Sequence, residues 1–358
     1  MKKKWFLCLI VIFVIYICNC WEYLERLWSP GMFYVAKGNT TSWLEKVYQF
    51  CSPLYAYTLD TEETVVQVED RSTYEMLLQQ QAADEDRFAE DLEQIEEVPA
   101  EPVQSVPLEQ LKDFSYLLSK YYTVDSTTSV SEDLLNAETL LGKDMHIDVD
   151  KEGPKVLIFH THSQEAFWDS VSGDSNNTIV GMGAYFSELL NEKGIETMHH
   201  SGVYDLINGK LDRSSAYQYA VEAVQGILNE NPSIEVVIDL HRDGVGEDKH
   251  LVTEIDGEQT AKIMYFNGLS YTKANGSISY LPNPYIQDNL AFSLQMQLAT
   301  EQLYPNLASK IYLKGYRYSL HMMPKSLLIE AGAQTNTVSE MRNAMKALAN
   351  VLEQVLVK

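Results

Sequence analysis

Three short apolar runs in the second half of the chain each lead into a polar residue of a type that binds metals or transfers protons. Runs of four or five apolar residues are typical of buried strands in a sheet that helices cover. In open α/β sheets, ligands collect at the carboxyl ends of such strands. The pattern therefore predicts an α/β domain with its functional site at one edge of the sheet. The runs are residues 156–159, 236–240 and 326–329, followed by His160, His241 and Glu330.

Amphipathic segments separate these runs and predict the helices of the same domain. They are residues 180–193, closed by Gly194, residues 214–229, residues 289–303 and residues 338–356, and residues 262–266 read as a further strand. Strands that alternate with helices indicate a mixed, mostly parallel sheet flanked by helices. We expect one catalytic domain of this kind, resembling the zinc amidases and exopeptidases, over residues 106–358.

The chain begins with three lysines followed by an apolar stretch that contains no charged residue before Glu22. The 17 residues from Trp5 to Trp21 would span about 26 Å as a helix, close to the roughly 30 Å of a bilayer core. No small-residue cleavage pattern follows, which favours a retained signal anchor over residues 1–21, with a cleaved signal peptide as the alternative. The lysines place the downstream chain outside the cytoplasm.

Charge and cysteine content narrow the class of protein further. With 27 basic and 51 acidic residues the formal charge is -24, which disfavours binding to nucleic acid. Only Cys51 of the four cysteines lies away from the N-terminal apolar run, so a disulfide framework is not expected. Acidic residues crowd residues 84–101. We therefore expect an extracytoplasmic linker over residues 22–105, although a solvated acidic helix would have the same composition.

The segment from His160 to Glu165 is the strongest chemical signal, because it holds two histidines and a carboxylate within six residues. A catalytic zinc ion takes three nitrogen or oxygen ligands and leaves one position for water. His162, Glu165 and His241 would fill such a set, in the spacing that carboxypeptidase-like enzymes use. Glu330 would then take the proton of the water and pass it to the leaving group.

Neighbouring polar residues have roles that the spacing leaves open. His160 could replace His162 as the ligand, support it, or bind substrate, since alternation along a strand points both the same way. Arg242 and Asp243 could bind substrate, for example by pairing the guanidinium with a carboxylate, or could form a turn held by a structural salt bridge. Asp239, two residues before His241, could accept a hydrogen bond from that imidazole.

These motifs resemble those of the stage II sporulation protein P family, whose members are cell-wall hydrolases related to zinc-dependent N-acetylmuramoyl-L-alanine amidases. The pair His-Thr-His-x-x-Glu and Asp-Leu-His-Arg-Asp-Gly carries most of the resemblance. In related amidases the glutamate that binds zinc lies in the helix after the first ligand. The segment 180–193 begins without a glutamate, so the His-x-x-Glu spacing assigns the role of zinc ligand to Glu165. The matching segments are residues 122–128, 157–167, 237–244, 261–264, 327–332 and 335–337.

The resemblance implies a substrate and a setting that the residues alone do not. The substrate would be peptidoglycan, cut between muramic acid and L-alanine and also at peptide cross-links, during engulfment in sporulation. The domain would act outside the mother-cell membrane, in the intermembrane space, with stage II sporulation proteins D and M as partners and Zn²⁺ as cofactor. Two other functions fit the same residues: a carboxypeptidase-like zinc peptidase and a non-catalytic cell-wall-binding scaffold.

Overall fold

A computed structural model describes residues 106–358, except residues 208–209, 212 and 214. The predicted signal anchor, residues 1–21, and the predicted linker, residues 22–105, lie outside the described residues. Among the helices that are described, none is both long enough and apolar enough to cross a membrane. The fold below is therefore that of the predicted catalytic domain alone.

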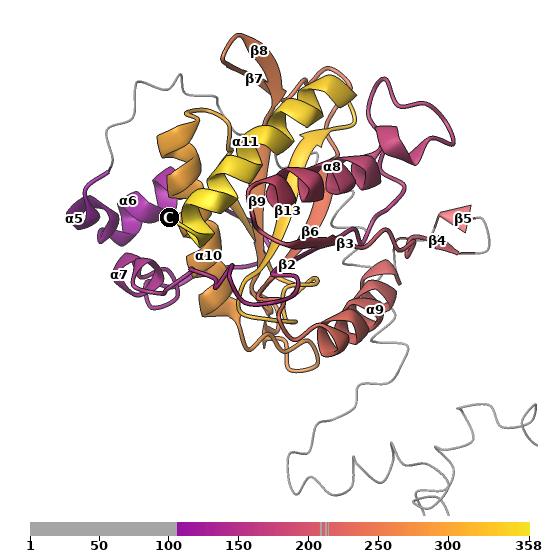
Figure 1. Cartoon of the computed structure of the whole chain (residues 1–358). Helices are drawn as coiled ribbons and strands as arrows, with labels where there is room; N and C mark the ends of the chain where they lie inside the picture. The colour runs from indigo at the N-terminus through magenta and orange to yellow at the C-terminus, as the bar shows by residue number, and fades with distance from the viewer. Residues whose placement is uncertain (1–105, 208–209, 212, 214) are drawn as a thin grey trace, which may run out of the picture. The chain divides into compact units, whose positions relative to one another are not determined.

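A seven-stranded sheet forms the centre of the domain (Figure 1). The neighbours β13 and β9 run antiparallel, and every other adjacent pair in this sheet is parallel. The predicted mixed, mostly parallel sheet is thus confirmed. In spatial order the strands are β1 (Tyr122–Val124), β12 (Ile311–Lys314), β9 (Ile263–Gly268), β13 (Ser326–Ala333), β6 (Val236–Asp243), β2 (Val156–Phe159) and β3 (Thr197–His199).

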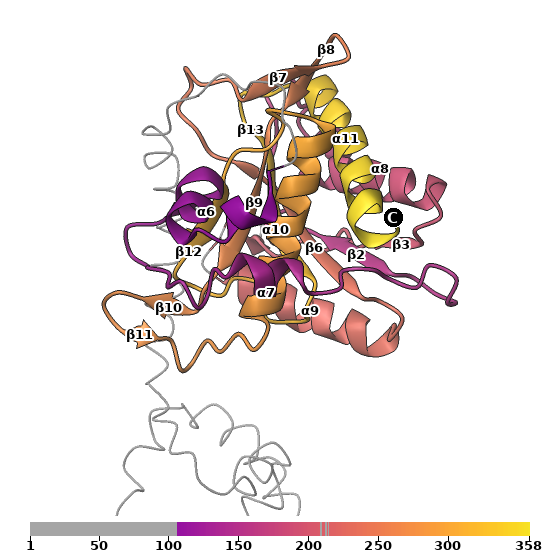
Figure 2. The same ribbon diagram turned by 90° about the vertical axis from the view of Figure 1, so that its left-hand side faces the viewer.

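Helices cover the two faces of the sheet unequally. On one face lie α8 (Ile179–Glu192), α10 (Ile286–Leu303) and α11 (Val338–Leu356), and their buried side chains form the main core with the strands. On the other face the long helix is α9 (Ala216–Glu230), which packs over β2 and β6 through Ala220 and Val224. Figure 2 shows α8, α10 and α11 on one side of the strands and α9 below them. Part of the second face remains available for a site.

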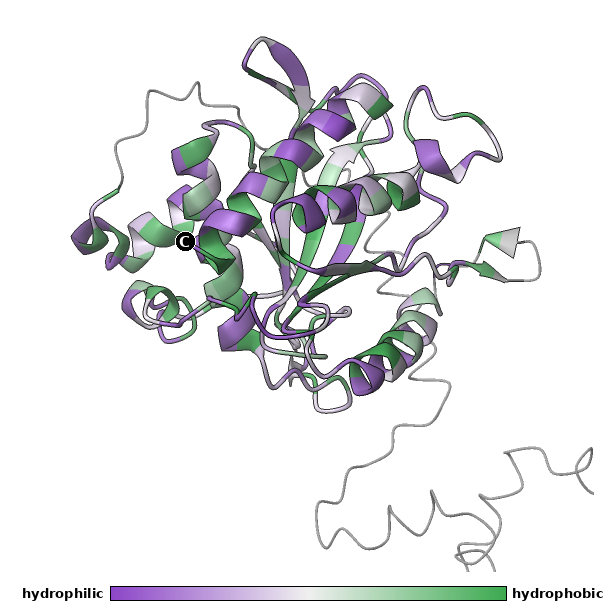
Figure 3. Cartoon of the chain, in the orientation of Figure 1, coloured by the Kyte–Doolittle hydropathy of each residue, from purple (hydrophilic) through white to green (hydrophobic). Residues whose placement is uncertain are grey.

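Alternation along each strand decides which side chains reach the second face. In β6, Val236, Ile238 and Leu240 join the main core, while Val237 packs with α9 on the opposite side. Because successive side chains point to opposite faces, Asp239 and His241 share the face of Val237. Strand β13 repeats the pattern, with Leu327 and Ile329 in the main core and Glu330 therefore on the face of His241. Figure 3 shows that the central strands are coloured largely as hydrophobic.

Small elements surround the sheet. Helices α5 (Leu108–Leu111), α6 (Phe114–Tyr121) and α7 (Ala137–Leu141) lead into or pack beside the β1 and α10 side of the domain, and η3 (Ser175–Asn177) precedes α8. Three hairpins project from the domain: β4 (Leu206–Ile207) with β5 (Lys210–Leu211), β7 (Val252–Ile255) with β8 (Glu258–Ala261), and β10 (Tyr271–Thr272) with β11 (Gly276–Ser277). The sequence patterns did not predict these hairpins or β12.

The predicted helices are confirmed to within three residues at each end, and α11 has the predicted bounds. Three strands run further than predicted, since β6 continues to Asp243, β13 to Ala333 and β9 to Gly268. The pairing of β13 with β6 becomes irregular between Glu330 and Ala333. Gly332 lies there with φ of 59°, and a Cβ on it would come within 2.5 Å of Met341 Sδ. His241 and Glu330 therefore lie inside strands, whereas the sequence placed them at strand ends.

Thr337 begins α11 with a capping box, because its hydroxyl accepts from Glu340 N at 3.3 Å while Glu340 Oε2 accepts from Thr337 N at 2.9 Å. We expect Thr337→Ala to lower the free energy of unfolding by about 1 kcal/mol, because it leaves a helix-end amide without its acceptor. Urea unfolding followed by circular dichroism measures this. Thr337→Ser retains the hydroxyl and is the control; an equal loss in that variant would contradict the capping role.

Candidate active site

A pocket of about 680 Å³ opens on the second face of the sheet. Its floor comes from β6, β13, β9 and β12, and its walls come from the loop after β2, the start of α9 and the loop after β12. All four residues predicted to carry the chemistry line it. The lining residues are His162, Glu165, Leu211, Arg213, Tyr217, His241, Arg242, Asp243, Gly244, Val245, Phe266, Lys314, Tyr318, Leu328, Glu330 and Gln334.

His162, Glu165 and His241 converge at one end of this pocket. Each is only 2% exposed. The imidazole rings of His162 and His241 lie with their centroids 5.2 Å apart, and His241 Nδ1 lies 3.8 Å from Glu165 Oε2. Glu330 is directly opposite His241 in the β13–β6 register, about one strand spacing, or 4.8 Å, away. Segments 165 residues apart in the chain thus supply one compact group of ionisable side chains.

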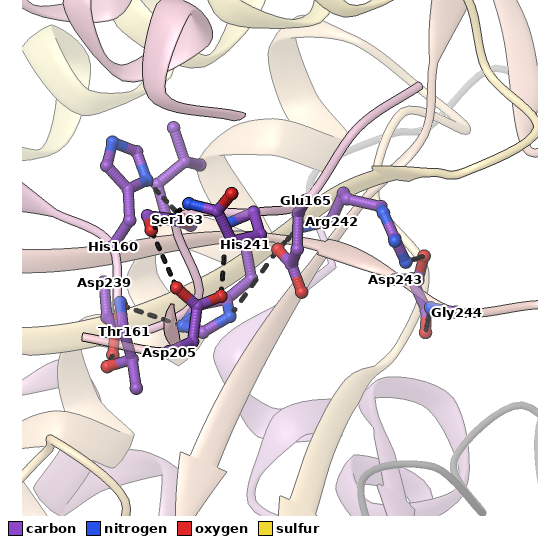
Figure 4. A network of polar contacts seen from close by, with 12 residues as sticks. His160, Thr161, Ser163, Glu165, Asp205, Asp239, His241, Arg242, Asp243 and Gly244 are labelled. Carbon is purple, nitrogen blue, oxygen red and sulfur yellow. Dashed lines mark hydrogen bonds and ion pairs between the residues drawn. The ribbon is translucent and has the colours of Figure 1, made fainter. Parts of the chain in front are cut away.

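Asp239 holds this group together through four hydrogen bonds, and Figure 4 shows it beside Thr161 and His241. Its Oδ1 accepts from Thr161 N at 2.9 Å and contacts His241 Nε2 at 2.8 Å. Its Oδ2 accepts from the hydroxyls of Thr161 at 2.6 Å and Ser319 at 2.7 Å. The predicted bond between Asp239 and the imidazole is therefore present. It fixes the ring so that Nδ1 faces Glu165.

The charges of this pair depend on one another. Burial alone would raise the pKa of Asp239, but the charge of His241 and the hydrogen bonds from His241 and Thr161 lower it to about 2. Burial alone would lower the pKa of His241, but Asp239 and then Glu165 and Glu330 raise it to about 10. The pair of Asp239 and His241 therefore favours the charged form of each group, with a proton on both nitrogens of the imidazole. A cation bound at Nδ1 would have to replace the proton on that nitrogen.

Four further hydrogen bonds, two to Asp205 and two to Glu165, fix the loop that carries His162 and Glu165. Buried Asp205 accepts from Ser163 Oγ at 2.7 Å and from Gln164 N at 3.1 Å. Glu165 itself accepts from Arg242 N at 2.9 Å and from Arg213 Nη2 at 3.4 Å. The carboxylate of Glu165 is therefore oriented from both sides before any ligand binds (Figure 4).

Carboxylates crowd this end of the pocket. Burial and then the charges of Glu330 and Glu165 raise the pKa of Asp243 well above its ordinary value, although Gly244 N and Arg242 act in the opposite direction. Carboxylates gathered at one place favour a bound cation. The donor types fit zinc, since two imidazoles and a carboxylate are a common catalytic set and one imidazole is already held by a carboxylate.

The present arrangement is not yet a coordination sphere. Across the described part of residues 106–358, no three His, Cys, Asp or Glu side chains stand in a geometry that could hold a metal ion. His162, Glu165 and His241 would need to close by small side-chain movements. Zinc binding by these three residues stays a prediction.

His160 lies away from the pocket. It is fully buried, its Nδ1 is 2.7 Å from Leu240 O, and its Nε2 is 3.0 Å from His199 Nε2. Burial and the neighbouring His199 lower its pKa to about 3. Strand β2 ends at Phe159, so the alternation that would point His160 and His162 the same way does not apply. His162 lines the pocket and His160 does not, which leaves the expected substrate contact of His160 without structural support.

Arg242 and Asp243 line the pocket, as the sequence suggested, but their polar atoms also hold the backbone. The Arg242 guanidinium donates to Ala166 O at 3.2 Å and to Asp243 O at 3.1 Å. Asp243 Oδ1 accepts from Gly244 N at 2.7 Å. Substrate binding by either residue remains a prediction, and their contacts show that both order the loop after β6.

Sequence reasoning missed several lining residues. Tyr217 packs against both imidazoles, with its ring centroid 5.5 Å from that of His162 and 6.4 Å from that of His241. Tyr318 stands edge-on to Tyr217 at 5.4 Å and to Phe266 at 4.7 Å. No spacing in the sequence links these rings. Lys314 did carry a signal, because a lysine directly follows the apolar run 311–313.

The sequence matches known proteins along most of its length. A family model described as stage II sporulation protein P matches residues 44–353. A curated relative, stage II sporulation protein P of Bacillus subtilis (strain 168), is 23% identical over 215 residues, which cover 56% of this chain and 50% of the relative. The chain thus spans about half the length of the curated relative it matches.

Solved structures with a partly similar fold include two amidases. The CwlD amidase from Clostridioides difficile, in complex with the GerS lipoprotein, has a TM-score of 0.36 and 13% identity, over 56% of this chain and 98% of that one. The N-acetylmuramoyl-L-alanine amidase AmiC2 of Nostoc punctiforme has a TM-score of 0.34 and 15% identity, over 57% of this chain and 98% of that one.

The network around Asp239 predicts a graded response to mutation. Asp239→Asn places an amide nitrogen among hydrogen-bond donors and leaves His241 without its charge partner, so we expect a loss of about 3 kcal/mol in the free energy of unfolding. Ser319→Ala removes one neutral donor of the four and should cost about 1 kcal/mol. Equilibrium urea unfolding compares the two variants. An equal loss in both would show that the charge pair is not the main contribution.

Proposed function

Because the chain belongs to the stage II sporulation protein P family, we propose that it is a peptidoglycan hydrolase of sporulation, and more narrowly an N-acetylmuramoyl-L-alanine amidase. The observation that supports this best is the buried convergence of His162, Glu165 and His241 beside Glu330 in one pocket. Two imidazoles and a carboxylate with a neighbouring general base are the parts that metal-assisted amide hydrolysis needs.

His162, Glu165 and His241 would hold the zinc ion. A zinc ion held there would supply Lewis-acid chemistry, which would polarise the scissile carbonyl and bring the pKa of water towards about 7. Glu330, on the strand next to His241, would accept the proton of the attacking water and deliver it to the leaving amine of L-alanine. Asp239 would keep the imidazole of His241 in the orientation that presents Nδ1.

The wider setting is part of the proposal. Residues 1–21 would anchor the chain in the membrane, with residues 22–105 as a tether and the catalytic domain on the extracytoplasmic side. Peptidoglycan would then lie within reach of the tether. By family resemblance, the enzyme would also cut peptide cross-links and work with stage II sporulation proteins D and M in engulfment.

Digestion of purified peptidoglycan by the full chain tests the reaction. We expect soluble stem peptides with a free L-alanine amino terminus, because the amide between muramic acid and L-alanine is the proposed bond. Mass spectrometry of the products identifies the new termini. Products with cut cross-links alone would assign a carboxypeptidase-like or endopeptidase activity in place of the amidase, and binding without any product would indicate a cell-wall-binding scaffold.

The same digestion includes a matched pair of glutamate variants. Glu330→Gln preserves shape but removes the proton acceptor, so the rate should fall by about 10²- to 10⁴-fold. Glu254→Gln changes an exposed glutamate of the β7–β8 hairpin and should leave the rate unchanged.

Metal analysis of the purified chain tests the ligand set. We expect about one zinc ion per chain in the wild type and a large loss in His162→Ala and His241→Ala, because each variant removes one of three ligands. His146→Ala is the control, since His146 is exposed and contacts Asp144 away from the pocket. Unchanged zinc content in Glu165→Ala would remove Glu165 from the ligand set.

A further inference from the structure

Lys314 is a buried lysine in the pocket that the proposed chemistry does not use. It is 3% exposed and lines the same cavity as His162 and Glu330. Lysine is almost never this buried without compensation, because an ammonium group loses its hydration. A lysine in this position could contact a substrate bound in the pocket.

The strand pattern directs Lys314 into the pocket. In β12, Ile311 and Leu313 belong to the main core, whereas Tyr312 packs on the opposite face with Phe266. Alternation therefore places Lys314 on the same face as Tyr312 and His241. Its position at the end of β12 makes it the last residue of the pocket floor on that side of the sheet.

The floor between Lys314 and Glu330 is apolar. Phe266 of β9 lies opposite Leu328 of β13 and opposite Tyr312 of β12 in the sheet register. Both Phe266 and Leu328 line the pocket, and Tyr318 packs edge-on against Phe266 at 4.7 Å. A substrate segment that crosses this floor would contact the apolar side chains of Leu328 and Phe266 before it reaches Lys314.

The two ends of the pocket, at His241 and at Lys314, differ in the charged residues that line them. The end at His241 carries the carboxylates of Glu165, Asp243 and Glu330, and like charges gathered in this way repel a further anion. A substrate carboxylate would be repelled there, and the nearby Arg213 already donates to Glu165. The end at Lys314 lies two strands away from Glu330 in the sheet and three strands away from Asp243.

Asp125 lies near Lys314 and offers an alternative role for this lysine, namely a structural ion pair. Its carboxylate contacts Tyr312 OH at 3.1 Å and Thr127 N at 2.8 Å. Burial alone would raise the pKa of Asp125, but bonds from Thr127 and the charge of Lys314 lower it. Lys314 thus belongs to a buried ionic group with Asp125, and it also lines the pocket. A lysine with a purely structural role would pair with Asp125 and make no contact with the substrate.

We propose that Lys314 binds a carboxylate on the peptide part of the substrate and so fixes the direction in which the substrate lies. The inference rests on the proposed function. Strands β13 and β12 are two strand spacings, or about 10 Å, apart. Lys314 lies opposite Gly268, four residues along β9 from the partner of Glu330, which adds about 13 Å along the strand.

The chemistry of the substrate decides which part reaches Lys314. In an amide between muramic acid and L-alanine, the carboxyl group of the sugar part is itself the acyl group of the scissile bond. Any free carboxylate near the bond therefore belongs to the peptide. At about 3.3 to 3.6 Å per extended residue, and allowing for the length of the lysine, this carboxylate lies about three or four residues beyond the cut.

Comparison of native peptidoglycan with peptidoglycan whose peptide carboxylates have been converted to amides tests the proposal, using the full chain. Amidation should raise KM for the wild type about tenfold or more, since a charge-assisted hydrogen bond is lost. Because Lys314 is remote from the scissile bond, kcat should stay within about twofold. Lys314→Met should cut both substrates with the same raised KM, and Lys314→Arg should retain the preference.

Lys310→Met is the matched control, since Lys310 is an exposed lysine of the neighbouring loop that donates to Ser119 O, and it should behave as wild type. Equal KM values of the wild type for the two substrates would overturn the proposal even if Lys314→Met does not fold. If Lys314→Met still prefers the native substrate, Lys314 does not bind the substrate carboxylate, and its role is to pair with Asp125. Failure of the wild type to cut either substrate would instead refute the proposed amidase, and this inference with it.

Discussion

The carboxylate of Asp239 is the constraint on which the arrangement of the site depends. It is 1% exposed, and a carboxylate so buried is stable only when donors satisfy both oxygens. The donors come from the loop after β2, from β6 and from the loop after β12, through Thr161, His241 and Ser319. Loss of the carboxylate would therefore release three segments at once. The position of His241 and the path of the loop that carries His162 follow from the same bonds.

This network also explains why the chemistry lies on a face of the sheet and not only at its edge. The helices α8, α10 and α11 cover one face and fill it with apolar side chains, so polar residues of β6 and β13 are tolerated only on the other. There α9 covers β2 and part of β6 but leaves β13, β9 and β12 open to a pocket. Because β6 and β13 are parallel and in register, His241 and Glu330 become neighbours without any contribution from loops.

The sequence predicted what depends on local periodicity and missed what depends on tertiary packing. The apolar runs gave β2, β6 and β13, and parallel pairing then brought His162, His241 and Glu330 together. The sequence could not separate His160 from His162, because the alternation rule was extended past Phe159, where β2 ends. The antiparallel β9 has no local signature that separates it from a parallel strand. Tyr217 enters the site only because α9 crosses the sheet at that point, and no spacing encodes such a crossing.

The pocket combines two electrostatic environments that a single sheet keeps apart. Strand spacing separates Lys314 from the acidic group around Glu330 by two strands and several residues, and Phe266 and Leu328 form an apolar floor between them. A substrate with a neutral scissile amide and a carboxylate on one side of it would fit these two environments in one orientation only. The polarity that positions a cation near His241 and Glu165 would therefore also orient the bond to be cut, so that binding and chemistry depend on the same face of β6, β13, β9 and β12.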